Sequence, residues 1–254
     1  MPRLPRLLVS VRNHEEARVA ARAGVDIIDF KEPANGSLAP VSWTVLRESL
    51  AEVSKAAPEM AVSVACGEVT DAQTLPEVAL GPIQFLKIGL AGLGGERNWV
   101  QRWSERRRQL SDSFIAHDGK SPGWIAVAYV DHEVANSPPI EEVIAASIDN
   151  GCRGVLFDTF SKRQDSLLQL LTPESLTNFS QQIQAAGLLV AAAGKVRVSD
   201  VPTLMSCGVD VIAVRSAVCE EERRERVLCP VAIANLQAAL GREAQTIEFS
   251  SKAR

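Results

Sequence analysis

The chain has 254 residues, a formal net charge of −4, and 46% hydrophobic residues. This composition excludes a disordered or collagen-like chain and provides enough apolar side chains for a large core. The negative net charge disfavours nucleic acid as a partner, because no overall positive field attracts a polyanion. The 27 basic residues comprise 20 Arg and only 7 Lys, so the positions of the lysines are informative.

The cysteines and histidines give no sign of a cross-link or a metal. Five widely spaced cysteines without a CxxC pair argue against a disulfide framework or a structural zinc site. His14, His117 and His132 are too far apart in sequence to indicate a metal site. The apolar stretch Leu7–Val11 is too short for a signal-peptide core, and no window approaches the ~18 apolar residues of a membrane span. We therefore expect a cytoplasmic protein with no membrane partner.

Short apolar runs alternate with helix-like segments from one end of the chain to the other. Eight strands are predicted: Leu7–Val11, Ile27–Lys31, Ala61–Gly67, Phe85–Leu90, Trp124–Asp131, Gly154–Phe160, Leu188–Gly194 and Val211–Ser216. Seven helices are predicted: Glu15–Ala23, Val41–Ser54, Arg97–Leu110, Ile140–Asn150, Pro173–Ala186, Val198–Ser206 and Glu225–Leu240. Only the third connection is weak, with a short segment at Thr74–Ala79.

This alternation predicts one α/β domain. The strands are near-continuous apolar runs, as expected of parallel strands covered by helices on both faces. Alternating strands and helices imply right-handed crossovers, and a glycine follows four of the helices, as expected of left-handed caps. No linker divides the chain, so we favour a single-domain (β/α)₈ TIM barrel with its core at about 5–241 and a tail at 242–254. An open doubly wound sheet is the alternative.

Lysines and aspartates gather where the strands end. Active sites of (β/α)₈ barrels lie at the carboxyl ends of the strands, so polar residues there are the candidates for chemistry. Four of the seven lysines lie in or just after these ends, whereas many of the arginines lie in the helices. The candidates are Asp29, Lys31, Lys87, Asp158, Lys162 and Lys195.

The choice of lysine has a chemical reason. A guanidinium stays protonated, whereas a desolvated lysine amine, or one near other cations, can act as a base or an imine-forming nucleophile. Asp29 and Asp158 fit proton transfer and equally fit a structural pairing with these lysines. A solvated loop position is the plain alternative for Lys31 or Lys162 taken alone, but not for Lys87, which interrupts an apolar strand.

A second group of residues is typical of a phosphate site. In this fold phosphate binds near the loops after strands seven and eight, where small residues expose backbone N–H groups and an arginine can add charge. Tight packing of small residues is the alternative explanation. The predicted phosphate-binding residues are Gly194, Lys195, Arg215, Ser216 and Ala217.

Three further features adjoin the predicted site. The loop 32–40 after strand two fits either a cover for a bound substrate or a rigid surface turn. Tyr129, the only tyrosine, shares a strand face with Asp131 and is a candidate for the pocket. The mixed-charge run Glu220–Arg226 is typical of a solvated helix start.

Several motifs together resemble one known family, the (5-formylfuran-3-yl)methyl phosphate synthases of methanofuran biosynthesis. They run in order through nearly the whole chain: Leu-Leu-Val-Ser at 7–10, Gly-Val-Asp-Ile-Ile-Asp-Phe-Lys-Glu-Pro at 24–33, Gly-Ser-Leu at 36–38, Leu-Lys-Ile-Gly-Leu at 86–90, Asp158-Thr159 with Lys162, and Val-Arg-Ser-Ala-Val-Cys at 214–219. The resemblance implies a TIM-barrel lyase that condenses two glyceraldehyde 3-phosphate molecules to a furan phosphate with loss of phosphate, without metal or organic cofactor.

The resemblance also implies roles for individual residues. Lys31 matches the Schiff-base lysine and Lys87 the proton acceptor, with Asp29, Asp158 and Lys162 completing the catalytic site. An imine on Lys31 acidifies the adjacent carbon of a triose phosphate, Lys87 removes that proton, and the resulting enamine attacks the aldehyde of the second triose. We expect Lys31 to carry the first covalent intermediate and Lys162 the second.

Two alternative functions share these residues. The first is another Schiff-base aldolase or dehydratase acting on one sugar phosphate, and the second is a non-catalytic barrel that binds phosphorylated metabolites. The expected partner in each case is a small phosphorylated molecule, and self-association of the chain is left open.

Overall fold

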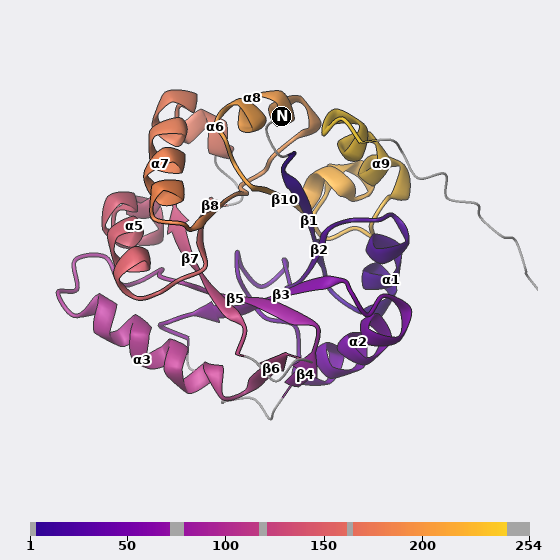
Figure 1. The fold of residues 1–254 in the computed structure, drawn as a ribbon, viewed down its shortest axis with the longest axis horizontal. Coiled ribbons are helices and arrows are strands. Elements are labelled where there is room, and N and C mark those ends of the chain that lie inside the picture. The colour runs from indigo at the N-terminus through magenta and orange to yellow at the C-terminus, as the bar shows by residue number, and fades with distance from the viewer. Residues whose placement is uncertain (1–3, 72–78, 117–120, 162–164, 243–254) are drawn as a thin grey trace, which may run out of the picture.

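The computed structural model describes residues 4–71, 79–116, 121–161 and 165–242. Eight parallel strands close into a barrel in the order β1-β10-β9-β8-β7-β5-β3-β2, with the helices outside it (Figure 1). The predicted TIM barrel is therefore confirmed, and the open sheet is excluded. The barrel strands are β1 (Arg6–Val11), β2 (Ile27–Phe30), β3 (Ala61–Glu68), β5 (Ile83–Gly89), β7 (Gly123–Tyr129), β8 (Gly154–Asp158), β9 (Leu189–Ala192) and β10 (Val211–Val214).

The outer helices follow the strands as the sequence predicts, with short additional turns. The longer helices are α1 (His14–Arg22), α2 (Trp43–Ala56), α3 (Trp99–Ser111), α5 (Ile140–Asp149), α7 (Pro173–Ala185), α8 (Val201–Ser206) and α9 (Pro230–Ala239). The short ones are α4 (His132–Ala135), α6 (Leu167–Leu170) and the 3₁₀ turns η1 (Val198–Asp200), η2 (Ser216–Val218) and η3 (Glu220–Glu222).

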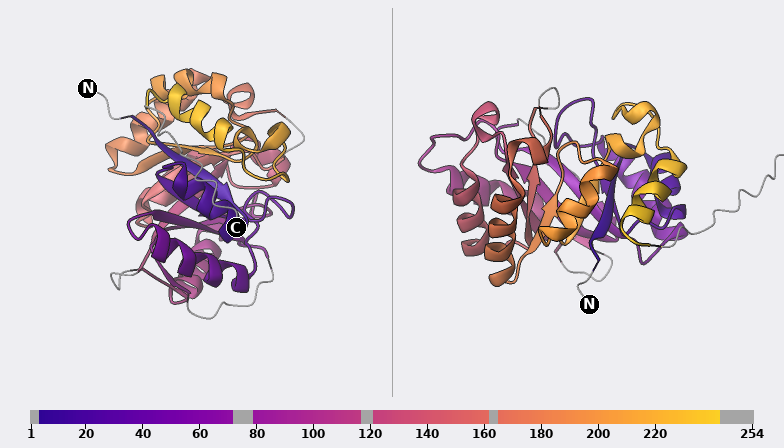
Figure 2. Two further views of the ribbon diagram at one scale, coloured as in Figure 1. Left: turned by 90° about the vertical axis from the view of Figure 1, so that its right-hand side faces the viewer. Right: turned by 90° about the horizontal axis from the view of Figure 1, so that it is seen from above.

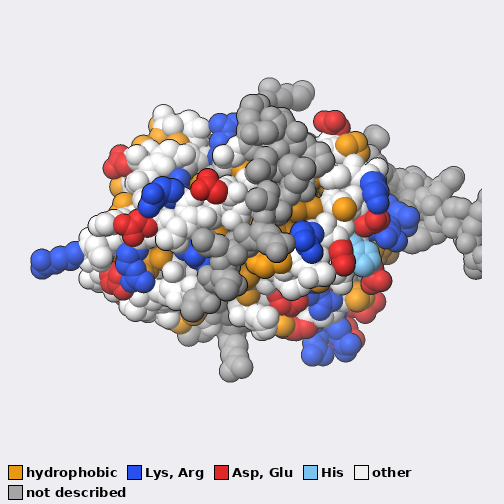
Figure 3. Space-filling view, turned by 90° about the horizontal axis from the view of Figure 1, so that it is seen from below, with side chains coloured by type: hydrophobic (Ala, Val, Ile, Leu, Met, Phe, Trp, Pro, Cys, Tyr) orange, Lys and Arg blue, Asp and Glu red, His pale blue; other side chains and the backbone are white. Residues whose placement is uncertain are grey.

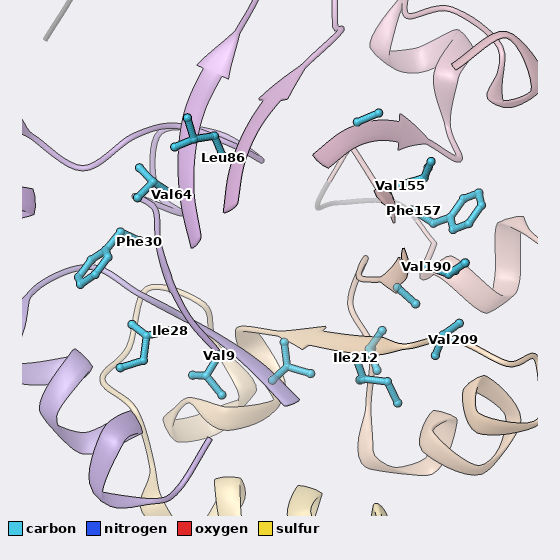
Figure 4. Packing of buried hydrophobic residues seen from close by; sticks show 14 of the residues in the cluster. Val9, Ile28, Phe30, Val64, Leu86, Val155, Phe157, Val190, Val209 and Ile212 are labelled. Atoms are coloured by element: carbon cyan, nitrogen blue, oxygen red, sulfur yellow. The ribbon is translucent and has the colours of Figure 1, made fainter. Parts of the chain in front are cut away.

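Alternation along each strand divides the apolar residues into two cores. On β2, Ile28 and Phe30 point outward (Figure 4), and they belong to the core cluster that also contains helix residues such as Leu46 and Leu50. Ile27 points inward and packs in a smaller cluster inside the barrel. The period of two places Asp29 on the same inner face as Ile27, which is the arrangement the sequence predicts.

Local sequence signals explain where the helices begin and end. Side chains of Asn13, Ser42 and Thr172 accept hydrogen bonds from backbone N–H groups in the first turns of α1, α2 and α7. A glycine with positive φ follows each of four helices, with φ of 69° at Gly24, 63° at Gly151, 78° at Gly187 and 76° at Gly208. The predicted left-handed caps are therefore confirmed.

The structure corrects the prediction at two places. The last helix begins at Pro230 rather than at Glu225, because a bridge between Cys219 and Leu228 holds the preceding segment in a turn. A two-stranded parallel sheet of β4 (Ala79–Gly81) and β6 (Phe114–Ala116) lies outside the barrel beside α2 and α3 (Figure 1). The weak segment predicted at 74–79 and the predicted tail lie outside the described residues, except for Ala79, which begins β4, and Arg242.

The direction of the strands distinguishes the two ends of the barrel. In the right-hand view of Figure 2, β1 rises from the labelled N-terminus, so the carboxyl ends of the parallel strands lie at the opposite edge. Figure 3 shows acidic and basic side chains interspersed on one side of the molecule. No helix in the described part of the chain is long and apolar enough to cross a membrane.

Candidate active site

A pocket opens at the carboxyl ends of the barrel strands. Among the described residues that line it, five side chains carry positive charge and two carry negative charge, so its balance favours an anion, unlike that of the whole chain. The lining residues are Ser10, Asp29, Lys31, Leu38, Lys87, Leu156, Asp158, Ala193, Gly194, Lys195, Val196, Ala213, Val214, Arg215, Ser216 and Arg224.

A buried ion pair lies on the inner wall of this pocket. The Lys87 Nζ is 2.6 Å from the Asp29 Oδ1, and the two side chains are 5% and 0% exposed. The Ser10 hydroxyl, on the neighbouring strand β1, donates a hydrogen bond of 3.0 Å to the Asp29 Oδ2. A carboxylate and an amine in contact can exchange a proton, which is the property that general acid and base chemistry needs.

Lys31 and Asp158 line the same pocket and are both buried. Lys31 follows β2 directly, and its backbone N–H donates to the carbonyl of Val11. The Asp158 carboxylate ends β8 and accepts hydrogen bonds from the Thr159 N–H at 2.8 Å and the Ser37 hydroxyl at 3.0 Å. Chain positions 31, 87 and 158 thus meet in one cavity, as the barrel prediction requires.

The other predicted site residues divide into three groups. Gly194, Lys195 and Ser216 line the pocket, and Lys195 has a left-handed backbone with φ of 56°. Ala217 is partly buried and packs against the outer core. Lys162 lies outside the described residues, so its role stays a prediction.

The guanidinium of Arg215 is occupied by the protein itself. It donates to both carboxylate oxygens of Glu16, at 2.6 and 3.1 Å, and to the backbone carbonyls of Ser10, Arg224 and Arg226. Burial opposes ionisation of Glu16, but hydrogen bonds from Arg215 and Arg12 outweigh it and lower the pKa of this carboxyl. This geometry gives Arg215 a structural role, and a phosphate contact by it stays a prediction.

A second polar chain lies behind the pocket and was not predicted as a whole. The Tyr129 hydroxyl donates a hydrogen bond of 2.5 Å to the Glu68 Oε1, and the Ala91 N–H donates to the Glu68 Oε2 at 2.9 Å. Gly89 makes room for this carboxyl, because a Cβ there would overlap it. Ser37 lies between Tyr129 and Asp158, so the chain reaches the pocket wall.

The ionisation of this pair is set chiefly by burial. Burial raises the pKa of the Tyr129 hydroxyl well above its ordinary value of 10.0, and the nearby negative charge of Glu68 raises it further. Burial also raises the pKa of Glu68, although hydrogen bonds from Tyr129 and Ala91 act in the opposite direction. Tyr129 is therefore a stable hydrogen-bond donor at neutral pH.

The loop after β2 is fixed to the barrel and forms part of the pocket wall. Leu38 and Ser37 are 1% and 3% exposed, and the Leu38 carbonyl accepts a hydrogen bond from the Gly67 N–H. The Arg224 Nη2 donates to the Gly36 carbonyl at 3.1 Å. These contacts agree with the predicted rigid turn, and a role as a cover for a bound substrate stays a prediction.

Other polar candidates have structural partners. The Asp131 carboxylate accepts hydrogen bonds from the backbone N–H groups of Phe160 and Ser161, so it holds the start of the loop after β8. No cluster of three or more His, Cys, Asp or Glu side chains suited to a metal ion occurs among the described residues. The titratable groups among the described lining residues of the pocket are lysines, arginines and aspartates.

Sequence comparison points to one family. A family model described as 4-HFC-P synthase matches residues 7–237. The chain is 32% identical to the (5-formylfuran-3-yl)methyl phosphate synthase of Methanopyrus kandleri over 228 residues, which are 87% of this chain and 92% of that protein. It is 28% identical to a putative (5-formylfuran-3-yl)methyl phosphate synthase of Methylorubrum extorquens over 241 residues, 93% of this chain and 92% of that protein.

Solved structures with this fold are more distant. A KGPDC from Streptococcus mutans in complex with D-R5P covers 94% of this chain and 98% of its own, with a TM-score of 0.58 and 13% identity. A thiamine phosphate pyrophosphorylase from Pyrococcus furiosus covers 94% and 96%, with a TM-score of 0.55 and 14% identity. These likenesses support the barrel fold alone.

Proposed function

Because the chain belongs to the 4-HFC-P synthase family, we propose that this enzyme condenses two glyceraldehyde 3-phosphate molecules to (5-formylfuran-3-yl)methyl phosphate. Two trioses supply the six carbons of this product, and atom balance requires that one phosphate and two waters leave. The observation that carries the proposal is a pocket rich in positive charge, in which Lys31, the Asp29–Lys87 pair and Asp158 meet.

The first steps follow from the chemistry of an imine. The Lys31 amine attacks the aldehyde carbon of one triose, and loss of water forms the imine, which acidifies the proton on carbon 2. Lys87 in its amine form, having passed a proton to Asp29, removes that proton. The electron pair left on carbon 2 expels phosphate from carbon 3, and the product is an enol with a nucleophilic carbon 3.

The positions of the substituents on the furan define the carbon–carbon bond. The formyl group, its ring carbon and the next ring carbon come from the triose that lost phosphate. The ring carbon that bears the methyl phosphate comes from carbon 2 of the second triose. Carbon 2 must therefore become a ketone by proton transfer before carbon 3 of the first triose attacks it, so this ketone replaces the aldehyde expected from the sequence as the carbonyl that is attacked. Ring closure and two dehydrations then complete the furan, and hydrolysis of the imine consumes one water and releases the formyl group from Lys31. We assign the proton transfers of these steps to Asp158, which lines the pocket.

The test is turnover of glyceraldehyde 3-phosphate by the purified enzyme. We expect an ultraviolet absorbance from a furan aldehyde to appear together with one phosphate released per furan formed. Phosphate release without a furan, or dihydroxyacetone phosphate or fructose bisphosphate as the sole product, would support the alternative aldolase or dehydratase. Binding without any turnover would support the non-catalytic barrel instead.

A further inference from the structure

Arg224 is a cation at the pocket that has no role in the proposed reaction steps. It follows η3, in the connection between β10 and α9, and its half-buried side chain lines the pocket with Lys195 and Ser216. Two left-handed residues, Glu221 and Glu222, with φ of 56° and 52°, precede it. Such backbone is costly for residues other than glycine, and it persists where the surroundings require it.

The donors of Arg224 are only partly used by the protein. Its Nη2 donates to the Gly36 carbonyl, whereas its buried Nε has no hydrogen-bond partner among the described residues. A buried donor without a partner destabilises the protein, and a hydrogen bond to a ligand oxygen can remove that cost. An anionic ligand would also stabilise the positive charge of Arg224, because burial lowers the pKa of this guanidinium even though the nearby charge of Asp158 raises it.

Arg215 differs from Arg224 in this respect. Its donors go to Glu16 and to backbone carbonyls, and one of those carbonyls belongs to Arg224 itself, with the Arg215 Nε 2.8 Å from the oxygen. Arg215 therefore fixes the backbone from which the Arg224 side chain reaches the pocket. Arg215 therefore has a structural role, whereas Arg224 has an N–H donor without a partner among the described residues.

We propose that Arg224 binds the phosphate group of the substrate and selects phosphorylated over unphosphorylated trioses. The substrate class rests on the proposed function above. A planar guanidinium binds phosphate through charge-assisted hydrogen bonds. Gly194 and Lys195 line the same pocket as Arg224. Because Arg224 also holds Gly36, a phosphate bound there lies beside the loop that forms the pocket wall.

The test measures binding of inorganic phosphate by calorimetry, with no need for turnover. We expect Arg224→Gln to weaken phosphate binding and to raise KM for glyceraldehyde 3-phosphate by about 10- to 100-fold, the range for a charged hydrogen bond. Arg224→Lys keeps the charge and should recover part of the loss. Unphosphorylated glyceraldehyde has no phosphate to expel but can still form an imine, so its borohydride adduct on Lys31 should form to the same extent in the wild type and in Arg224→Gln.

Arg223→Gln is the matched control. Arg223 is the adjacent residue, and its side chain is 61% exposed. The Arg223→Gln variant should therefore bind phosphate as tightly as the wild type. Circular dichroism and thermal unfolding establish that each variant is folded. If folded Arg224→Gln binds phosphate as tightly as the wild type, or if the wild type binds none, the proposal is wrong. If phosphate binding depends on Arg224 but no furan forms, this assignment stands and the proposed reaction fails.

Discussion

The division of labour between lysine and arginine is visible residue by residue. Lys31, Lys87 and Lys195 line the pocket, where an amine that can lose its proton is chemically useful. Arg215 also lines the pocket, but its guanidinium pairs with Glu16 of α1, and Arg242 pairs with Asp26, which directly precedes β2. These two arginines thus differ from the pocket lysines in role, since they pair with structural carboxylates.

The Asp29–Lys87 pair should show strong energetic coupling. Asp29→Asn leaves the Lys87 ammonium buried without its counter-charge, so we expect the free energy of unfolding to fall by about 3 kcal/mol. Lys87→Met should cost a similar amount, and the double variant should be more stable than the sum of the two losses implies. Urea unfolding of the four proteins measures this coupling. Additive losses would show that the two charges do not interact.

The absorbance of Tyr129 reports on the hydrogen bonds behind the pocket, because Tyr129 is the only tyrosine in the protein. Its raised pKa means that its contribution to stability is complete below pH 10 and is lost as pH rises through the folded value. We expect tyrosinate absorbance to appear only well above pH 10, as the protein unfolds. Glu68→Gln should shift the titration to lower pH, since a negative neighbour is removed. Titration near pH 10 in folded wild-type protein would contradict the buried hydrogen bond.

At the scale of elements, the pocket depends on connections between segments far apart in sequence. The Arg215–Glu16 pair joins the loop after β10 to α1 across a separation of 199 residues. The Ser37 to Asp158 hydrogen bond joins the loop after β2 to the end of β8. Each connection holds one wall of the pocket against the barrel.

Arg215→Met tests the structural role of this residue. At pH 7 we expect a loss of about 3 kcal/mol, because the Glu16 carboxylate stays buried with fewer donors. The lowered pKa of Glu16 means that its stabilisation is present above pH 4.5 and is lost as pH falls through the folded value, so the gap to wild type should shrink in acid. Unfolding curves at several pH values measure this, with Arg223→Met as an exposed control expected within about 0.5 kcal/mol of wild type. A variant of wild-type stability with a raised KM would instead favour the phosphate contact.

At the scale of the whole molecule, periodicity made most of the barrel predictable. The inward positions of Asp29 and Lys87 follow from the two-residue repeat of their strands, and the carboxyl ends of parallel strands meet at one mouth. The glycine caps were also predictable, because a left-handed cap depends on local backbone conformation alone.

The residues that were missed depend on contacts that local sequence does not contain. Glu68 ends a strand without any motif, and its place is made by Gly89 on the neighbouring strand. Arg224 belongs to a mixed-charge run that is typical of a solvated segment, but the turn at Glu221 and Glu222 brings its side chain to the pocket. Conversely, the sequence predicts a phosphate contact for Arg215, whereas in the structure its guanidinium pairs with Glu16, a partner that is close only once the barrel has closed.

Borohydride trapping tests most directly whether the lysines at the barrel mouth perform imine chemistry. The enzyme is incubated with glyceraldehyde 3-phosphate and borohydride, digested, and mapped by mass spectrometry. We expect a stable adduct on Lys31, and we expect Lys31→Arg, which keeps the charge but forms no imine, to lose this adduct and all turnover while still binding phosphate. An active Lys31→Arg variant, or wild-type protein that makes the furan with no adduct on Lys31, would contradict the role given to this residue.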